Sequence, residues 1–214
     1  MNHFTKQASR RLALVGLGVL IQAAASSTAR ADGLETLPHA CALLLSEARF
    51  ELEDRREEER LAPIRSAADQ AIYELLEPLW KARSTEWLRY LAARHARDRS
   101  RLEVDRAGIE TKRAEEKLTA LTRECVDPGA GTEKPTLRYE RLGCDLARKT
   151  RDIAALDLAY RKEVLESTNE LRRLELATAQ DLIHARYALD RAKAQLQSRS
   201  ARWDRCKRAS GRHP

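Results

Sequence analysis

A repeating stripe of apolar residues in the second half of the chain constrains the fold most. From Leu146 to Cys206 it advances in steps of three and four residues, about 3.5 on average, the period of a helix in a left-handed coiled coil. The positions are Leu146, Lys149, Ile153, Leu156, Tyr160, Val164, Ser167, Leu171, Leu174, Thr178, Leu182, Ala185, Leu189, Ala192, Leu196, Arg199, Trp203 and Cys206. Because no proline or glycine interrupts residues 145–209, the stripe predicts one continuous helix over 144–208.

The first half of the chain supplies a partner stripe. Before a central loop the same spacing occurs at Val104, Ala107, Thr111, Ala114, Leu118, Leu121 and Cys125, and further back lie Ile72, Leu75, Leu76, Leu79, Trp80, Trp87, Leu88 and Leu91. We expect a first arm over 63–126 that packs against 144–208, with a loosely packed stretch at 92–101, where charged residues crowd the sequence. The predicted fold class is all-α: a long antiparallel helical hairpin, or coiled coil, with an extra N-terminal helix.

Helix-breaking residues give the boundaries of these segments. Pro63 follows a charged run and is expected to end a separate helix over 32–62, whereas Pro78 is expected to kink the first arm. Residues 127–143 contain a cluster of prolines and glycines and form the predicted hairpin tip, and 209–214 form a tail. The tip does not match the spacing of a phosphate-binding loop, so no nucleotide site is expected there.

The N-terminal 31 residues have the layout of a secretory signal. Lys6, Arg10 and Arg11 precede an apolar run over 12–25, and a small-residue stretch ends in Ala31, after which we expect cleavage. The run is shorter than the roughly 20 residues that cross a bilayer, so no transmembrane segment is expected after cleavage. The chain is therefore predicted to be exported and to reside in the periplasm or outside the cell.

Charge and composition narrow the classes of partner. The formal net charge of +7 would fall to +3 on signal removal, and the remaining cations alternate with acids, so nucleic-acid binding is not expected. Abundant Ala, Leu, Glu and Arg with few aromatic residues are typical of long helices and coiled coils.

Four cysteines in an exported chain indicate two disulfides. Cys125 and Cys144 flank the breaker-rich tip, so we expect them to pair and clamp it. Cys41 with Cys206 then follows by elimination, either within one chain, with the N-terminal helix folded back, or as bonds to other chains.

Charged and aromatic clusters provide the candidate binding residues. The acidic stretch 47–60 and the basic stretch 186–213 are expected to lie near the same open end of the hairpin. A polyanion could bind the basic end, although a solvated helix end is the plainer interpretation; the residues are Arg199, Arg202, Arg205, Lys207, Arg208 and Arg212. An aromatic stripe at helical spacing could be core or, as the alternative, a partner-docking face; it comprises Tyr73, Trp80, Trp87 and Tyr90.

No residue pattern for catalysis, a cofactor or a metal emerges. His39, His95 and His184 are not at metal-ligand spacing, and no serine lies in a nucleophile turn. No enzymatic activity, cofactor or metal is therefore expected.

One stretch resembles a known family. Residues 174–196, with Ala179-Gln180, Ala185-Arg186 and spaced Leu and Ala, resemble the C-terminal coiled-coil helix of TolC-like outer-membrane efflux proteins. The membrane-spanning strands and second helical repeat of that family are missing, so the resemblance implies at most an association with efflux or secretion machinery.

Together these patterns predict a non-enzymatic exported coiled-coil protein. The leading hypothesis is a spacer, scaffold or adaptor in a cell-envelope assembly, with protein partners there or self-association. The alternatives are a polyanion- or membrane-surface-binding module that uses the basic C-terminal end, and a component associated with efflux or secretion machinery.

Overall fold

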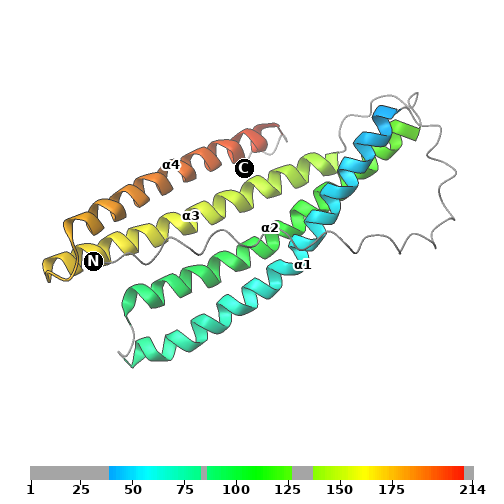
Figure 1. Ribbon diagram of the computed structural model, residues 1–214. Helices are drawn as coiled ribbons and strands as arrows, with labels where there is room; N and C mark the ends of the chain where they lie inside the picture. The colour runs from blue at the N-terminus through cyan, green and yellow to red at the C-terminus, as the bar shows by residue number, and fades with distance from the viewer. Residues whose placement is uncertain (1–38, 83–85, 127–136, 210–214) are drawn as a thin grey trace, which may run out of the picture. The chain divides into compact units, whose positions relative to one another are not determined.

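The described part of the chain is entirely built from helices. The structure, a computed structural model, describes residues 39–82, 86–126 and 137–209. In these ranges the helices are α1 (His39–Lys81), α2 (Trp87–Val126), α3 (Leu137–Arg173) and α4 (Ala179–Ala209), and no strand is present (Figure 1). The predicted all-α class is confirmed. The predicted signal segment 1–31 lies outside the described residues, as do most of the predicted tip and nearly all of the predicted tail.

Each helix packs only against its neighbours in chain order. Among the described residues, contacts join α1 to α2, α2 to α3 and α3 to α4, and no other pair of helices. In each pair, early residues of one helix meet late residues of the next, as in the contacts Arg55–Glu110 and His95–Asp157, so neighbours run in opposite directions (Figure 1). The helices thus pack as a bundle in which α1 and α4 each have a single neighbour.

The α1–α2 pair is closed by a narrow stripe of buried side chains, large and small on α1 and mostly small on α2. On α1 the buried residues are Leu45, Ala48, Leu52, Ala62, Tyr73 and Leu76. On α2 the predicted stripe is largely confirmed, because Ala107, Thr111, Ala114 and Cys125 are buried. This stripe meets α1, because Thr111 Oγ1 donates to the carbonyl of Arg55 at 3.1 Å, and α2 also packs against α3, within the predicted 144–208 arm.

The predicted boundary at Pro63 is wrong. α1 runs without a break through Pro63 and Pro78, so residues 32–62 do not form a helix separate from the first arm. A proline inside a helix removes one backbone hydrogen bond and costs about 3 kcal/mol in isolation. Here the buried stripe continues in phase on both sides of Pro63, with Ala62 buried beside it, so packing against α2 holds the helix together. The chain instead turns before Trp87, where the Glu86 carbonyl accepts the first hydrogen bonds of α2.

The predicted single helix over 144–208 is also wrong, because the chain turns at residues 174–178. The N–H of Leu176 donates to the carbonyl of Leu171 at 2.8 Å, and that of Glu175 donates to Arg172 at 3.1 Å. Glu175 has φ 58°, the left-handed conformation. These bonds are the Schellman termination, in which the left-handed position is usually glycine. The termination therefore forms without the glycine that normally signals it.

The start of α4 carries a recognisable sequence signal that the stripe analysis missed. Thr178 Oγ1 accepts from the N–H of Asp181 at 3.1 Å, and the Asp181 carboxylate accepts from the N–H of Thr178 at 2.8 Å. This reciprocal pair is a capping box. The side-chain and backbone hydrogen bonds from Thr178 lower the pKa of Asp181. Thr178 thus starts a helix and is not a position on a continuous stripe.

The two halves of the predicted second arm therefore fold back on each other. Ile153 on α3 is buried, as are Ala185, Leu189 and Ala192 on α4, so much of the predicted stripe is indeed the packed face. Leu174, predicted to continue the stripe, is exposed in the turn. Residue spacing identified which side chains are buried but not the point at which the helix reverses.

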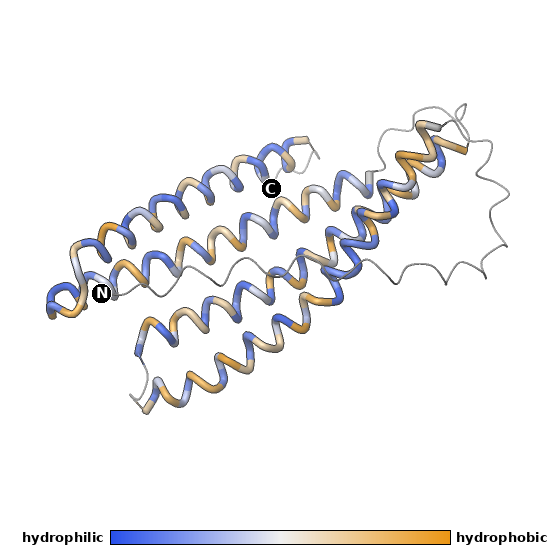
Figure 2. Tube along the Cα trace, in the orientation of Figure 1, coloured by the Kyte–Doolittle hydropathy of each residue, from blue (hydrophilic) through white to orange (hydrophobic). Residues whose placement is uncertain are grey.

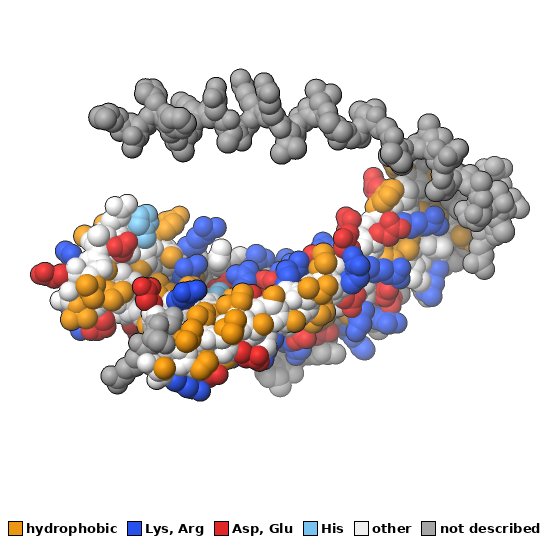
Figure 3. Space-filling view, turned by 60° about the horizontal axis from the view of Figure 1, so that its bottom comes forward, with side chains coloured by type: hydrophobic (Ala, Val, Ile, Leu, Met, Phe, Trp, Pro, Cys, Tyr) orange, Lys and Arg blue, Asp and Glu red, His pale blue; other side chains and the backbone are white. Residues whose placement is uncertain are grey.

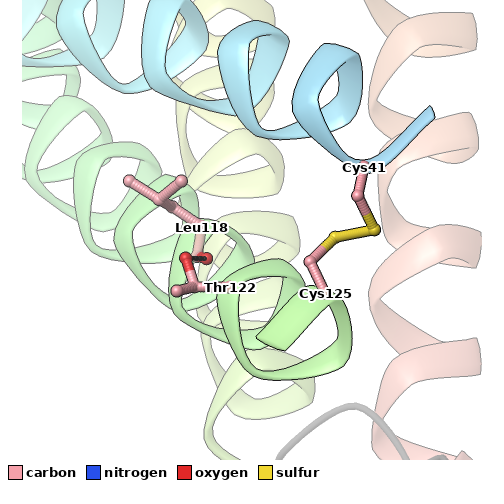
Figure 4. Close-up of a disulfide and its surroundings, with 4 residues drawn as sticks. All are labelled: Cys41, Leu118, Thr122 and Cys125. Carbon is pink, nitrogen blue, oxygen red and sulfur yellow. Dashed lines mark hydrogen bonds between the residues drawn. A yellow bond between two sulfur atoms is a disulfide. The ribbon is translucent and has the colours of Figure 1, made fainter. Parts of the chain in front are cut away.

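All four cysteines form disulfides, but the predicted pairing is wrong. The bonds are Cys41–Cys125, shown in Figure 4, and Cys144–Cys206. Their Cα–Cα distances are 5.7 and 5.5 Å. α3 begins at Leu137, not at Cys144, so Cys144 lies about 10 Å along the helix from its first residue and away from the end of α2. Each disulfide joins the first turns of one helix to the last turns of the next.

The disulfides close two helical hairpins at the ends opposite their turns. Cys41–Cys125 closes α1–α2, and Cys144–Cys206 closes α3–α4. The sequence separations are 84 and 62 residues, for which loop-closure entropy predicts a stabilisation of roughly 4–5 kcal/mol per bond.

The acidic stretch 47–60 does not meet the basic end of the chain as predicted. Its residues pair with α2: Lys117 Nζ lies 2.6 Å from Glu51, and Arg55 lies 2.8 Å from Glu110. Among the described residues α1 makes no contact with α4. The assumed alignment followed from the wrong Cys125–Cys144 pairing, so correcting the pairing also moves the acidic stretch.

Non-reducing peptide mapping tests the two hairpins. Tryptic peptides of the oxidised chain should contain the links Cys41–Cys125 and Cys144–Cys206. Replacing both cysteines of one pair by serine should lower the free energy of unfolding by about 2–5 kcal/mol in urea titrations. A Cys125–Cys144 link would contradict the fold.

The turn at 174–178 can be tested by glycine substitution. Glu175→Gly should stabilise the protein by about 1 kcal/mol, because glycine adopts the left-handed conformation without the strain of a Cβ. The matched control, Glu166→Gly inside α3, should destabilise it by about 1 kcal/mol. Urea unfolding midpoints measure both. Destabilisation by both substitutions would indicate a helix that continues through residue 175.

Candidate functional site

The four candidate aromatic residues form one cluster, contributed by two helices. Tyr73 and Trp80 belong to α1, and Trp87 and Tyr90 belong to α2, on either side of the turn. The Trp80 and Trp87 ring centroids lie 4.8 Å apart, and the Trp80 ring stacks on Tyr90 at 5.9 Å. Tyr73 is buried and the other three are half-buried. The stripe predicted on one helix is therefore the packed core of the α1–α2 turn.

Hydrogen bonds and a cation fix the inner edge of this cluster. The Tyr73 hydroxyl lies 3.4 Å from that of Tyr90 and donates to Glu77 at 2.9 Å, and the Arg97 guanidinium lies 3.8 Å from the Tyr73 ring centroid. The hydrogen bond with Tyr90, burial and the bond to Glu77 raise the pKa of Tyr73 to about 12. The Tyr73 hydroxyl stays protonated at neutral pH and serves as a structural donor.

A polar cluster joins α2 to α3. His95 Nε2 lies 2.8 Å from Asp157 Oδ1, and the His95 ring stacks on Tyr160 with centroids 4.2 Å apart. Arg94 donates to both carboxylate oxygens of Glu163, at 2.6 and 2.5 Å. Burial acts to raise the pKa of Asp157, but the His95 hydrogen bond and the Arg99 charge outweigh it and lower that pKa.

The polar cluster lines a cavity between α2 and α3. Its volume is about 280 Å³, and its walls include Leu91, Leu156 and Ala159 together with the paired polar side chains. The loose packing predicted at 92–101 is found in part: Arg94, His95 and Asp98 line this cavity, whereas Ala93 and Ser100 are buried and the charges pair across the α2–α3 interface. Sequence spacing could not find this cluster because His95 and Asp157 lie on separate helices.

The basic residues predicted at the C-terminal end lie in the last turns of α4. Arg199, Arg202, Arg205 and Arg208 are exposed, whereas Lys207 is half-buried and lies 2.9 Å from Asp204. Arg212 lies outside the described residues. The structure thus presents four of these six cations to solvent along one helix end.

An apolar face on α1 was missed by the sequence analysis. Ile72, Leu75 and Leu79 were expected to pack in the predicted hairpin, yet these side chains are exposed, whereas Leu76 is buried. Figure 2 shows the apolar character of this half of α1, and Figure 3 shows apolar side chains in a band along it. The missed signal is a second apolar stripe, because α1 is apolar on the side facing α2 and on the adjacent side, about 100° around the helix.

The described residues contain neither a metal-binding cluster nor a membrane-spanning helix. No group of three or more His, Cys, Asp or Glu side chains in ranges 39–82, 86–126 and 137–209 is arranged to hold a metal ion. No helix in those ranges combines the length and apolarity needed to cross a bilayer.

The His95–Asp157 contact should make the free energy of unfolding depend on pH in the acid range. Because the pKa of Asp157 is lowered in the folded chain, its contribution is present above the ordinary carboxyl pKa and is lost as pH falls through the folded-state value. Asp157→Asn should therefore lower the free energy of unfolding by about 1–2 kcal/mol at pH 7 and by less near pH 3. Urea unfolding across this pH range measures the difference. Asp190→Asn, at an exposed carboxylate, is the control; equal effects would contradict the assignment.

No family model, curated protein or solved structure matches the chain. The stretch 174–196 that resembles the coiled-coil helix of TolC-like efflux proteins is not one helix here, because it includes the turn before α4. The helical hairpins and their exposed surfaces therefore provide the basis for a functional proposal.

Proposed function

We propose that the chain is an exported, non-enzymatic helical protein that acts as a spacer, scaffold or adaptor in a cell-envelope assembly. The observation that carries the proposal is the placement of both disulfides: each closes one helical hairpin at the end opposite its turn. Disulfides form and persist in oxidising compartments, so this arrangement is compatible with export. It also resists separation of the paired helices, a useful property in a spacer.

The exposed apolar face of α1 supports a role in assembly. Ile64, Ile72 and Leu75 are each at least half exposed on a helix that already packs against α2 along another face. Large exposed apolar surfaces on folded proteins mark sites that contact other molecules. The long helices of an antiparallel coiled coil would present such a face at a fixed distance from the hairpin ends.

The basic end of α4 supports a second candidate, a module that binds anionic surfaces. Arg202, Arg205 and Arg208 are exposed in its last turns. Clustered cations of this kind attract phosphate-rich surfaces, with a strong dependence on salt. This function would use α4, whereas the scaffold function would use α1, so the two can be separated.

Crosslinking in cells tests the scaffold proposal. A photo-crosslinking amino acid at Ile72 or Leu75 should give a discrete adduct with an envelope protein or with the chain itself, and one at Val126 should not. Thiol alkylation without reductant should leave all four cysteines unlabelled. Labelled thiols in cells, or no adduct from α1, would contradict the proposal. If the anionic-surface function holds instead, vesicles with anionic lipid should bind the chain but not its Arg202→Glu/Arg205→Glu variant.

A further inference from the structure

The two outermost helices carry complementary surfaces. α1 contacts only α2 and α4 contacts only α3 among the described residues, so each has a side without a packed neighbour. On α1 that side is acidic near Asp54 and Glu57 and apolar from Leu61 to Leu79. On α4 it is apolar near Ile183 and Tyr187 and basic near Arg202 and Arg205.

The apolar half of the α1 side is continuous. Steps of three and four residues place six apolar side chains on one face, namely Leu61, Ile64, Ala68, Ile72, Leu75 and Leu79. Ile64 and Leu75 are 63 and 70% exposed. Arg65 lies at the edge of this face and pairs with Glu58, so the apolar row runs beside one cation between Leu61 and Leu79. A helix face of this kind in water favours contact with another apolar face.

The outer side of α4 offers a matching face. Ile183 and Tyr187 are 65 and 68% exposed, one helical turn apart. Ala194 and Ala201 continue the same face with small side chains, which let another helix approach closely. Arg205 follows one turn further on.

We propose that α1 of one copy packs antiparallel on α4 of a second copy, so that the chain assembles head to tail. With Leu75 opposite Ile183, Ile72 lies opposite Tyr187. The acidic end then meets the basic end, because 21 residues separate Asp54 from Leu75 and 22 separate Ile183 from Arg205, equal to within about 2 Å at 1.5 Å per residue.

Charge favours this contact over a symmetric one. An antiparallel α1–α1 contact centred on the apolar stretch would place Lys81 of the second copy near Glu57, but it would leave Arg202 and Arg205 of both copies without acidic partners. In the α1–α4 contact the carboxylates of Asp54 and Glu57 face Arg202 and Arg205. Among the described residues Asp54, Arg202 and Arg205 form no ion pair, and Glu57 lies 3.9 Å from Arg60. A contact between unlike faces leaves each bound copy with one face open, so it generates a ring or an open array. The inference deepens the proposed scaffold function and rests on it.

Two variants distinguish this assembly from its alternatives. The α1-face variant is Ile72→Glu/Leu75→Glu, and the α4-face variant is Ile183→Glu/Tyr187→Glu. All four side chains are at least half exposed, so both variants should fold, as circular dichroism would check. Sedimentation velocity should show assemblies for the purified oxidised chain that grow with concentration, and monomers for each variant alone. Val126→Glu, another exposed apolar position, is the control and should assemble like the unchanged chain.

Mixing gives the decisive result. Equal amounts of the two variants should form a dimer that stops at two chains, because only one intact α1 face and one intact α4 face remain. Assembly by the α4-face variant alone would overturn the proposal in favour of an α1–α1 contact. A monomeric unchanged chain would also overturn it, but would leave the scaffold function standing if crosslinking from α1 had captured a different envelope protein.

A charge exchange provides a second readout. Asp54→Arg/Glu57→Arg alone should weaken self-association by roughly tenfold or more, because like charges would then face each other. Adding Arg202→Glu/Arg205→Glu to the same chain should restore it. Failure of the combined variant to recover would contradict the proposed alignment of α1 on α4.

Discussion

The fold depends on two disulfides that close helical hairpins whose packed stripes are thin. Nine of the seventeen buried apolar residues in the described chain are alanines, and Leu91 is the one large side chain that is almost completely buried. Alanine lets helices approach closely but removes little apolar area from water. Loop-closure entropy of roughly 4–5 kcal/mol per disulfide is comparable to the total stability of many small domains. The two disulfides therefore supply stability that the small buried apolar area does not provide.

Polar contacts set the register between the helices. Arg55–Glu110 joins α1 to α2, whereas Arg94–Glu163 and His95–Asp157 join α2 to α3. A one-turn slip of α1 on α2, or of α2 on α3, would leave half-buried charges without partners, which is costly, whereas alanine stripes alone would tolerate such a slip. The aromatic cluster at the α1–α2 turn has the same effect, because four rings pack in one arrangement. Specificity thus comes from polar and aromatic contacts, and strength from the disulfides.

The extent to which the sequence predicts this fold varies from element to element. The three-four spacing correctly identified buried faces at Ala107, Thr111 and Ala114, and at Leu189 and Ala192, because helical periodicity is a local property. It could not show which stripes meet, since an apolar stripe fits several partners equally well. Two local features were misinterpreted. Thr178 and Asp181 form a capping box, which marks the start of a helix, and Pro63 lies inside a helix because packing holds the residues on both sides of it. The reversal at Glu175 had no glycine to mark it.

The cysteine pairing and the candidate surfaces depended on the same missing information. Proximity in sequence favoured Cys125–Cys144, but the helical start at Leu137 places these residues apart. Once the helices are ordered, the aromatic residues gather in one cluster, Glu51 of α1 pairs with Lys117 of α2, and Glu57 and Glu58 pair within α1. The outer faces of α1 and α4 emerge as the unpaired edges. No local pattern distinguishes an apolar face that packs within the chain from one that packs on another molecule.

The most direct test of this account is the distance between the start of α3 and the end of α4. Spin labels carried by unnatural amino acids at Arg148 and Arg202 would be measured by pulsed electron paramagnetic resonance, with both native disulfides intact. The folded-back hairpin predicts a separation below about 25 Å, because packed helix axes lie 8–10 Å apart and each label adds several ångströms. A separation of about 80 Å, the length of an unbroken helix between these residues, would contradict the account.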